Sequence, residues 1–163
     1  RMVVHVTYRT ESVEDTQNLG RHIGAFMAAS QDPICLALVG DMGAGKTHLS
    51  QGIGAGFGVV EEMTSPTFAL MNTYSVGRKT LYHFDLYRLE NPEELDTIGF
   101  YEYTEDKMAL VEWADKFPEE MPEETIWIYI DKNDDRTRTF RIESSSLSQD
   151  ELVAIGGSYV VGD

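Results

Sequence analysis

Gly40-Asp41-Met42-Gly43-Ala44-Gly45-Lys46-Thr47 matches the pattern G-x-x-x-x-G-K-[S/T] at every fixed position. A loop of this kind brings successive backbone N–H groups to phosphate oxygens, which requires positive φ angles and small side chains. The six residues before it, 34–39, are continuously apolar, as in a strand buried on both faces of a parallel sheet. Residues 46–57 then have a helical pattern that ends near Gly56 and Gly58. Strand, glycine loop and helix in this order predict a nucleotide-binding loop.

Residues 40–47, called here the phosphate loop, are expected to hold ATP or a close relative with Mg²⁺. The helix that follows directs its free N–H groups and positive dipole end at the same phosphates. Lys46 is expected to bridge the β- and γ-phosphates as a point charge, and the Thr47 hydroxyl to bind Mg²⁺. The cofactor-binding residues predicted are Asp41, Met42, Gly43, Ala44, Gly45, Lys46, Thr47 and His48.

Two carboxylates are candidates for the metal. Met108–Glu112 is an apolar strand that ends in an acid, which is the form of a Walker B strand, and Asp85 lies in a second apolar stretch. Strand alternation would place His83, Asp85 and Tyr87 on one face. The alternatives are a solvated acid at a strand end for Glu112 and an ion pair with a nearby arginine for Asp85.

The rest of the chain predicts an α/β protein. A first strand is expected at residues 3–8, and a helix from a Ser12–Asp15 capping box to about Ala29. Further elements are expected as a hairpin of residues 68–74 and 80–87, a short helix with Asn91 as its cap, strands at 108–111, 126–130 and 138–142, and a weak helix at 148–155. We expect residues 1–163 to form a single P-loop NTPase domain with a mostly parallel central sheet, antiparallel additions and flanking helices.

The composition is acidic, with 13 Lys and Arg against 28 Asp and Glu and a formal charge of −15. This charge disfavours direct tight binding of RNA or DNA and fits a solvated surface or a basic partner protein. No apolar run approaches the roughly 18 residues that span a bilayer, and residues 1–5 lack the pattern of a secretory signal. The single cysteine, Cys35, lies in an apolar run and is expected to be buried and inert. A cytoplasmic protein is expected.

Four further segments accompany the phosphate loop in a fixed order. They are Ser65-Pro66-Thr67-Phe68, His83-Phe84-Asp85-Leu86-Tyr87-Arg88-Leu89, Pro92-Glu93-Glu94-Leu95 and Leu110-Val111-Glu112-Trp113. With these segments the chain resembles, from about Ser12 to Trp113, the TsaE family, also called YjeE or YdiB. These are bacterial P-loop ATPases required for the N6-threonylcarbamoyladenosine modification of tRNA at position 37.

The resemblance implies a role for each matching residue. Lys46 and Thr47 would act on phosphate and Mg²⁺, Glu112 would be the Walker B-like metal ligand, and Asp85 would support the metal or position water. The stretch from Ser65 to Phe68 is similar to the switch I segment of the family, in which Thr67 would sense the γ-phosphate. Family members bind the TsaB–TsaD heterodimer and use ATP hydrolysis to reset it. His48 and Met42 depart from the usual family residues beside the phosphate contacts.

Slow intrinsic hydrolysis that a partner accelerates is expected, because no arginine finger is evident in the loop regions. A small-molecule kinase is the alternative, although the arginines at 136, 138 and 141 fall on a late hairpin that makes a poor lid. A nucleotide-dependent switch with negligible turnover is a third possibility. The absence of an N-K-x-D guanine motif favours ATP over GTP only weakly.

Overall fold

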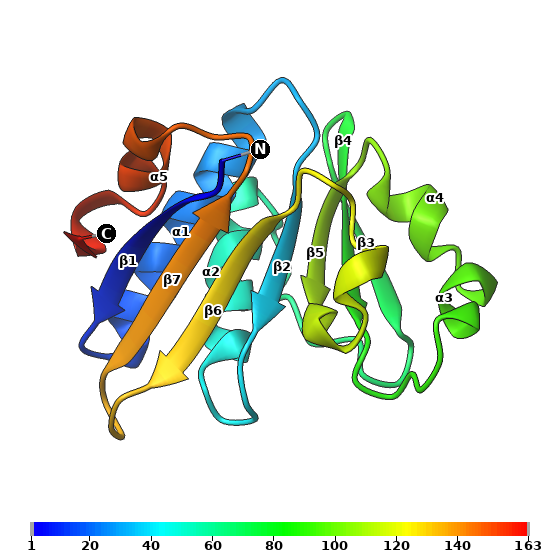
Figure 1. Ribbon diagram of the computed structural model, residues 1–163, viewed down its shortest axis with the longest axis horizontal. Coiled ribbons are helices and arrows are strands. Elements are labelled where there is room, and N and C mark those ends of the chain that lie inside the picture. Colours follow the sequence, from blue (N-terminus) through cyan, green and yellow to red (C-terminus); the bar gives the residue numbers. More distant parts are fainter. Residues whose placement is uncertain (1, 163) are drawn as a thin grey trace.

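The computed structural model describes residues 2–162, so that Arg1 of the N-terminal stretch and Asp163 lie outside the described residues (Figure 1). The strands are β1 (Val4–Thr10), β2 (Cys35–Val39), β3 (Met71–Val76), β4 (Lys79–Asp85), β5 (Met108–Glu112), β6 (Ile126–Lys132), β7 (Arg138–Ser144) and β8 (Val160–Gly162). The α-helices are α1 (Val13–Ala29), α2 (Lys46–Phe57), α3 (Glu93–Thr97), α4 (Phe100–Thr104) and α5 (Gln149–Ile155). Three single 3₁₀ turns are η1 (Ala114–Lys116), η2 (Pro118–Glu120) and η3 (Gly157–Tyr159). No helix within residues 2–162 is long and apolar enough to cross a membrane.

Within these residues the strands form one sheet in the order β3-β4-β5-β2-β6-β7-β1-β8. The central strands β4, β5, β2 and β6 are parallel, and the strands added at both edges pair antiparallel. This confirms the predicted α/β fold with a mostly parallel centre and antiparallel additions. Because parallel strands all end at the same edge, the ends of β2, β4 and β5 meet there, and ligands of such sheets bind at that edge.

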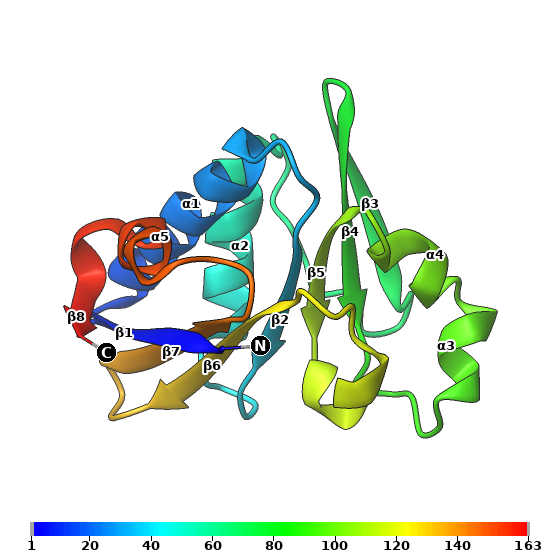
Figure 2. The same ribbon diagram turned by 45° about the horizontal axis from the view of Figure 1, so that its top comes forward.

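The sheet separates two apolar cores. Leu36 and Leu38 of β2 belong to a core shared with α1 and α2, whereas Cys35 and Ala37 belong to a second core that includes α3 and α4. Figure 2 shows α1 and α2 together on one side of the sheet, with α3 and α4 beside β3 and β4. The alternation explains why the sequence of β2 is apolar at every position, since both of its faces are covered.

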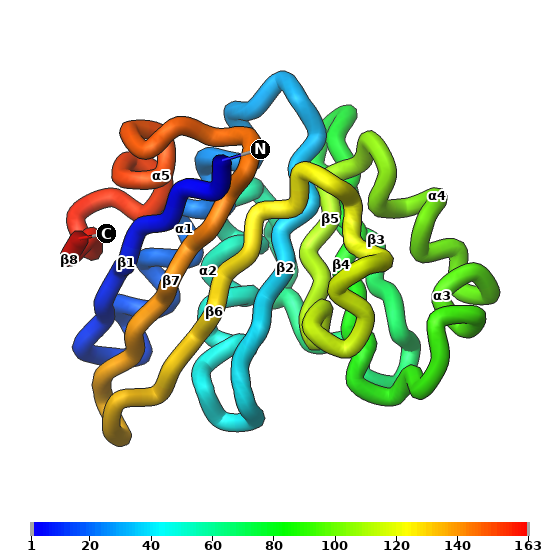
Figure 3. Tube along the Cα trace, viewed as in Figure 1, coloured from blue at the N-terminus to red at the C-terminus, as the bar shows by residue number. Residues whose placement is uncertain are grey.

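Helices α1 and α2 pack closely through glycines. A Cβ atom built at Gly24 would lie 2.0 Å from the Ile53 carbonyl oxygen, and one built at Gly52 would lie 2.1 Å from the Gln17 carbonyl oxygen. No side chain larger than hydrogen fits such a distance. The contact fixes α2, and Figure 3 shows that the chain passes from β2 through the phosphate loop directly into this helix.

The hairpin boundaries differ from the prediction. Strand β3 begins at Met71 rather than at Phe68, because the Leu70 N–H donates to the Pro66 carbonyl oxygen at 2.7 Å and closes a turn in which Leu70 has a φ of 70°. Strand β4 ends at Asp85, so Tyr87 lies outside the strand. The prediction that Tyr87 shares a strand face with His83 and Asp85 is therefore wrong.

Two helix starts also differ in detail. At α1 the Ser12 hydroxyl accepts from the Asp15 N–H at 3.0 Å as predicted, but the Asp15 carboxylate accepts from the Glu11 N–H. The predicted capping box is therefore half formed. At α3 Pro92, not Asn91, holds the capping position, and the Glu94 carboxylate accepts from two preceding N–H groups instead.

Candidate functional site

A cavity of about 350 Å³ lies at the edge where β2, β4 and β5 end. Most of the predicted site residues line it: Met42, Gly43, Gly45, Lys46, Thr47, His48, Thr67, Asp85 and Glu112. Asp41 and Ala44 belong to the same loop but do not line the cavity. The fold thus brings the phosphate loop, the switch-like stretch and both candidate carboxylates to one place.

The phosphate loop has the backbone form that anion binding needs. Gly43 and Gly45 have φ angles of 80° and 105°, a region that side chains disfavour. Within residues 2–162 the N–H groups of Gly43, Gly45, Lys46 and Thr47 donate to neither a backbone carbonyl nor a side chain. These donors, at the positive end of α2, are free to bind the oxygens of a phosphate.

Lys46 is held near the loop by two contacts. Its Nζ donates to the Gly40 carbonyl oxygen and lies 3.7 Å from the centre of the Trp113 ring. The side chain is 8% exposed, and this burial lowers the pKa of Lys46, while the nearby carboxylates of Glu112, Asp115, Asp85 and Asp41 act in the opposite direction. A buried ammonium suits a bound polyphosphate, because the negative charge of the phosphates would favour the charged form of Lys46 and oppose the effect of burial.

Glu112 ends β5 and is 2% exposed, so the alternative of a solvated acid is wrong. Its Oε2 lies 2.6 Å from Nε2 of His83, which is 1% exposed. The parallel register explains this meeting, since Asp85 pairs with Glu112 and His83 stands two residues earlier on β4. His83 therefore holds the Glu112 carboxylate on the cavity wall, a role that the sequence did not indicate.

Asp85 is 3% exposed and is held by neutral donors. Its Oδ2 accepts from the hydroxyls of Ser65 at 2.7 Å and Thr67 at 3.1 Å, and its Oδ1 accepts from the Tyr87 N–H at 2.9 Å. No ion pair joins Asp85 to an arginine within the described residues, so that alternative is wrong. The switch-like stretch is thereby tied directly to the end of β4.

The donor set fits a magnesium nucleotide. The described residues contain no group of three or more His, Cys, Asp or Glu that could enclose a metal ion by themselves. Mg²⁺ commonly binds through one or two carboxylates, a hydroxyl, substrate phosphates and water. Here Glu112 and Asp85 could supply the carboxylates, Thr47 the hydroxyl and a bound nucleotide the phosphates. A polyphosphate on the free N–H groups would complete the site.

Arg138 reaches the site from β7, the second strand of the late hairpin that carries the arginines at 136, 138 and 141. Its Nε donates to the Ala44 carbonyl oxygen at 2.8 Å, and the side chain lines the cavity. The late hairpin that seemed a poor lid thus supplies one arginine to the wall of the cavity. The hairpin itself was predicted, but its place beside the phosphate loop depends on the parallel pairing of β6 with β2, and no local pattern reports that pairing.

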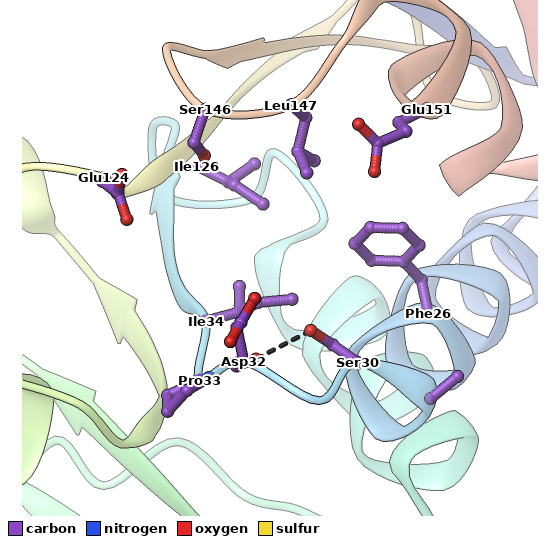
Figure 4. A pocket seen from close by; sticks show the side chains of 11 residues that line it. Phe26, Ser30, Asp32, Pro33, Ile34, Glu124, Ile126, Ser146, Leu147 and Glu151 are labelled. Atoms are coloured by element: carbon purple, nitrogen blue, oxygen red, sulfur yellow. Dashed lines mark hydrogen bonds between the residues drawn. The ribbon is translucent and has the colours of Figure 1, made fainter.

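A larger cavity of about 510 Å³ lies elsewhere, near the start of β2 (Figure 4). Phe26, Ile34 and Leu147 point into it, and the carboxylates of Asp32, Glu124 and Glu151 surround it. Neither a lysine, an arginine nor a histidine is among its described lining residues. Anionic phosphates would be repelled here, so size alone does not identify the nucleotide site.

Comparison with known proteins gives one consistent family. Residues 10–140 match the family model described as threonylcarbamoyl adenosine biosynthesis protein TsaE. A tRNA threonylcarbamoyladenosine biosynthesis protein TsaE of Haemophilus influenzae is 38% identical over 126 residues, covering 77% of this chain and 80% of that protein. The protein of the same name from Nostoc is 36% identical over 146 residues, covering 86% and 87%.

A solved structure is also similar. The crystal structure of YdiB from Bacillus subtilis superposes with a TM-score of 0.69 at 30% sequence identity and covers 93% of both chains. Similarity over nearly the full length means that the phosphate loop, both carboxylate strands and the β6–β7 hairpin all lie within the shared fold.

Proposed function

The chain belongs to the TsaE family, and from this premise we propose that it is a Mg²⁺-dependent ATPase of tRNA threonylcarbamoyladenosine biosynthesis. In this proposal it binds the TsaB–TsaD heterodimer in the cytoplasm and resets it through ATP binding and hydrolysis. Residues 1–163 act as a single P-loop NTPase domain. The net charge of −15 supports a protein partner, and it argues against direct tight contact with tRNA.

One observation carries the proposal: free N–H groups, a buried lysine and two buried carboxylates face the same cavity of about 350 Å³. The cations and N–H donors match phosphate oxygens, and the carboxylates match a divalent cation. Hydrolysis of a phosphoanhydride needs donors for the phosphate oxygens next to carboxylates for the metal ion. The arrangement therefore supports phosphoryl transfer rather than binding of a neutral ligand.

Each side chain has a proposed part in the reaction. When bound, Mg²⁺ neutralises charge that develops on the phosphate oxygens. Lys46 leaves the Gly40 carbonyl for the β- and γ-phosphates, and Thr47 and Glu112 are the residues that would hold the metal. Asp85, released from one of its two hydroxyl partners, orients the attacking water, and Thr67 then turns toward the γ-phosphate. These movements explain why a partner that orders residues 65–68 would accelerate turnover.

The test is phosphate release from MgATP by the purified protein, alone and with purified TsaB–TsaD, with Lys46→Ala as the inactive control. Low activity alone that rises with the heterodimer supports the proposal. Rapid formation of ADP that requires a small-molecule acceptor and ignores the heterodimer would favour a kinase instead. Tight nucleotide binding without turnover under either condition would favour a switch, and binding of GTP over ATP would correct the nucleotide.

A further inference from the structure

Arg138 joins two parts of the chain that are 94 residues apart, and the proposed reaction does not yet use it. Its Nε donates to Ala44, and its Nη1 donates to the carbonyl oxygens of Asp134 at 2.7 Å and Thr137 at 3.0 Å. The guanidinium is thus anchored on the β6–β7 hairpin while it holds one specific peptide group of the phosphate loop. The planar guanidinium suits this arrangement, because its several N–H donors can bond the hairpin carbonyls and the loop carbonyl at the same time.

The bonded carbonyl belongs to the peptide group that carries the Gly45 N–H. In a planar trans peptide the C=O of one residue and the N–H of the next point in opposite directions. A donor that holds the Ala44 oxygen on the hairpin side therefore keeps the Gly45 N–H pointing away from the hairpin. Gly45 lines the cavity and its N–H has no bond within residues 2–162, so this N–H is available to a phosphate.

This peptide group needs an external partner. Gly45 has a φ of 105° and carries no Cβ, so rotation of the Ala44–Gly45 peptide meets little steric resistance. Such a rotation would turn a carbonyl oxygen toward the phosphates in place of a donor. A charge-assisted hydrogen bond to the carbonyl opposes the rotation before any ligand arrives.

We infer that Arg138 is a positioning residue for nucleotide binding, which fixes the Ala44–Gly45 peptide so that the Gly45 N–H faces the phosphates. The inference rests on the proposed nucleotide site and adds to it a residue from outside the loop. It also couples the β6–β7 hairpin to nucleotide affinity. A general contribution of positive charge is the competing explanation, and it is separated by a variant that keeps the charge.

The experiment measures two quantities in wild type, Arg138→Lys and Arg138→Ala: the Kd for ADP, and the Gly45 amide resonance of the nucleotide-free protein. Arg141→Ala is the matched control, because Arg141 lies on the same strand, is 52% exposed and pairs with Glu143 at 2.8 Å. We expect ADP to bind roughly tenfold more weakly in both Arg138 variants, the loss of one charge-assisted hydrogen bond. The Gly45 resonance should shift or broaden in both, and the control should match wild type.

An ADP Kd within about twofold of wild type in Arg138→Lys, or an unchanged Gly45 resonance, would overturn the inference, because charge alone would then suffice. Arg138→Lys keeps the aliphatic stem and the charge, so the test holds even if Arg138→Ala does not fold. Failure of wild type to bind ADP would contradict the proposed function instead, and the Gly45 resonance would still report whether Arg138 fixes the peptide.

Discussion

His83 Nε2 lies 2.6 Å from Glu112 Oε2, and the two side chains are 1% and 3% exposed. Burial of an acid without a partner is costly, so His83 allows a carboxylate to sit inside the wall of the cavity at the end of β5. The pair fixes the position of the Glu112 carboxylate, which the proposed function uses as a metal ligand. Substitutions that keep the shape of a carboxylate side chain but remove its charge test its role.

Glu112→Gln should separate metal use from nucleotide binding. The amide keeps the size of the side chain and can still contact His83, but it removes the negative charge that Mg²⁺ requires. We expect partner-stimulated MgATP hydrolysis to fall by about tenfold or more. ADP affinity measured without Mg²⁺ should stay the same or improve. Glu143→Gln on β7 is the control, and an unaltered Mg²⁺ dependence in Glu112→Gln would contradict the role of Glu112.

Asp85→Asn should lower hydrolysis while leaving ADP affinity near that of wild type. The amide can still accept a hydrogen bond from Ser65 or Thr67, but it orients water less strongly than a carboxylate. We expect a fall of about tenfold in turnover at saturating MgATP. Thr67→Ser, which keeps the hydroxyl, is the matched control. Equal losses of ADP binding and turnover would show that Asp85 supports the fold rather than the reaction.

The ADP affinity should depend on pH through Lys46. Burial lowers the pKa of Lys46 from its usual value of 10.5, and phosphates bind the charged form. Affinity should therefore begin to decline at a pH lower than the one at which an ordinary lysine loses its charge. Lys46→Arg stays charged over this range and should show no decline. A flat profile in wild type would show that Lys46 keeps its charge throughout.

The same pKa shift predicts a change of stability in the opposite direction. Between the lowered pKa of folded Lys46 and 10.5, the unfolded chain binds more protons than the folded one. The contribution of Lys46 to the free energy of unfolding should therefore rise with pH in that window. Urea unfolding of wild type and Lys46→Met across the window measures it, and a difference that does not vary with pH would refute it.

Trp113 should report nucleotide binding by fluorescence. Lys46 Nζ lies 3.7 Å from the Trp113 ring centre, and its movement onto phosphates would remove a positive charge from the indole face. The sequence has two tryptophans, so Trp127→Phe leaves Trp113 as the reporter. We expect ADP to alter the emission of Trp127→Phe but not of Trp113→Phe. The reverse pattern would mean that Lys46 stays in place.

Gly52→Ala should destabilise the protein, since its Cβ would lie 2.1 Å from the Gln17 carbonyl oxygen. Overpacking of this kind typically costs about 1–3 kcal/mol in the free energy of unfolding. Ala55→Ser on the exposed side of α2 is the control and should change stability by less than about 0.5 kcal/mol. Equal stabilities of the two variants, measured by urea unfolding, would show that α1 and α2 can separate without cost.

The sequence predicted features that depend on neighbouring residues. The phosphate loop follows from the spacing of Gly40, Gly45 and Lys46, and the apolar residues before it follow from a strand covered on both faces. Glu112 could be found because an acid at the end of an apolar strand is a local signal. Most strand and helix positions were correct for the same reason, with errors of a few residues at turns such as residues 68–70.

Features that depend on the pairing of strands distant in the sequence were not predicted. The contact of His83 with Glu112 requires the register of β4 against β5, and the contact of Arg138 with Ala44 requires the predicted hairpin to pair through β6 with β2. Neither pairing leaves a periodic pattern in the chain. The end of β4 at Asp85 was also missed, because the Tyr87 N–H donates to the Asp85 carboxylate instead of continuing the strand.

The antiparallel pairing of β6 with β7 has a consequence for protein engineering. An antiparallel strand begins at the sheet edge where its neighbour ends, so Arg138, the first residue of β7, lines the cavity while Phe140 and Ile142 stay in the core. Position 138 and the hairpin before it can therefore be varied in a library while the residues of the phosphate loop and both carboxylates keep their identity. Nucleotide affinity could be tuned there from outside the loop sequence.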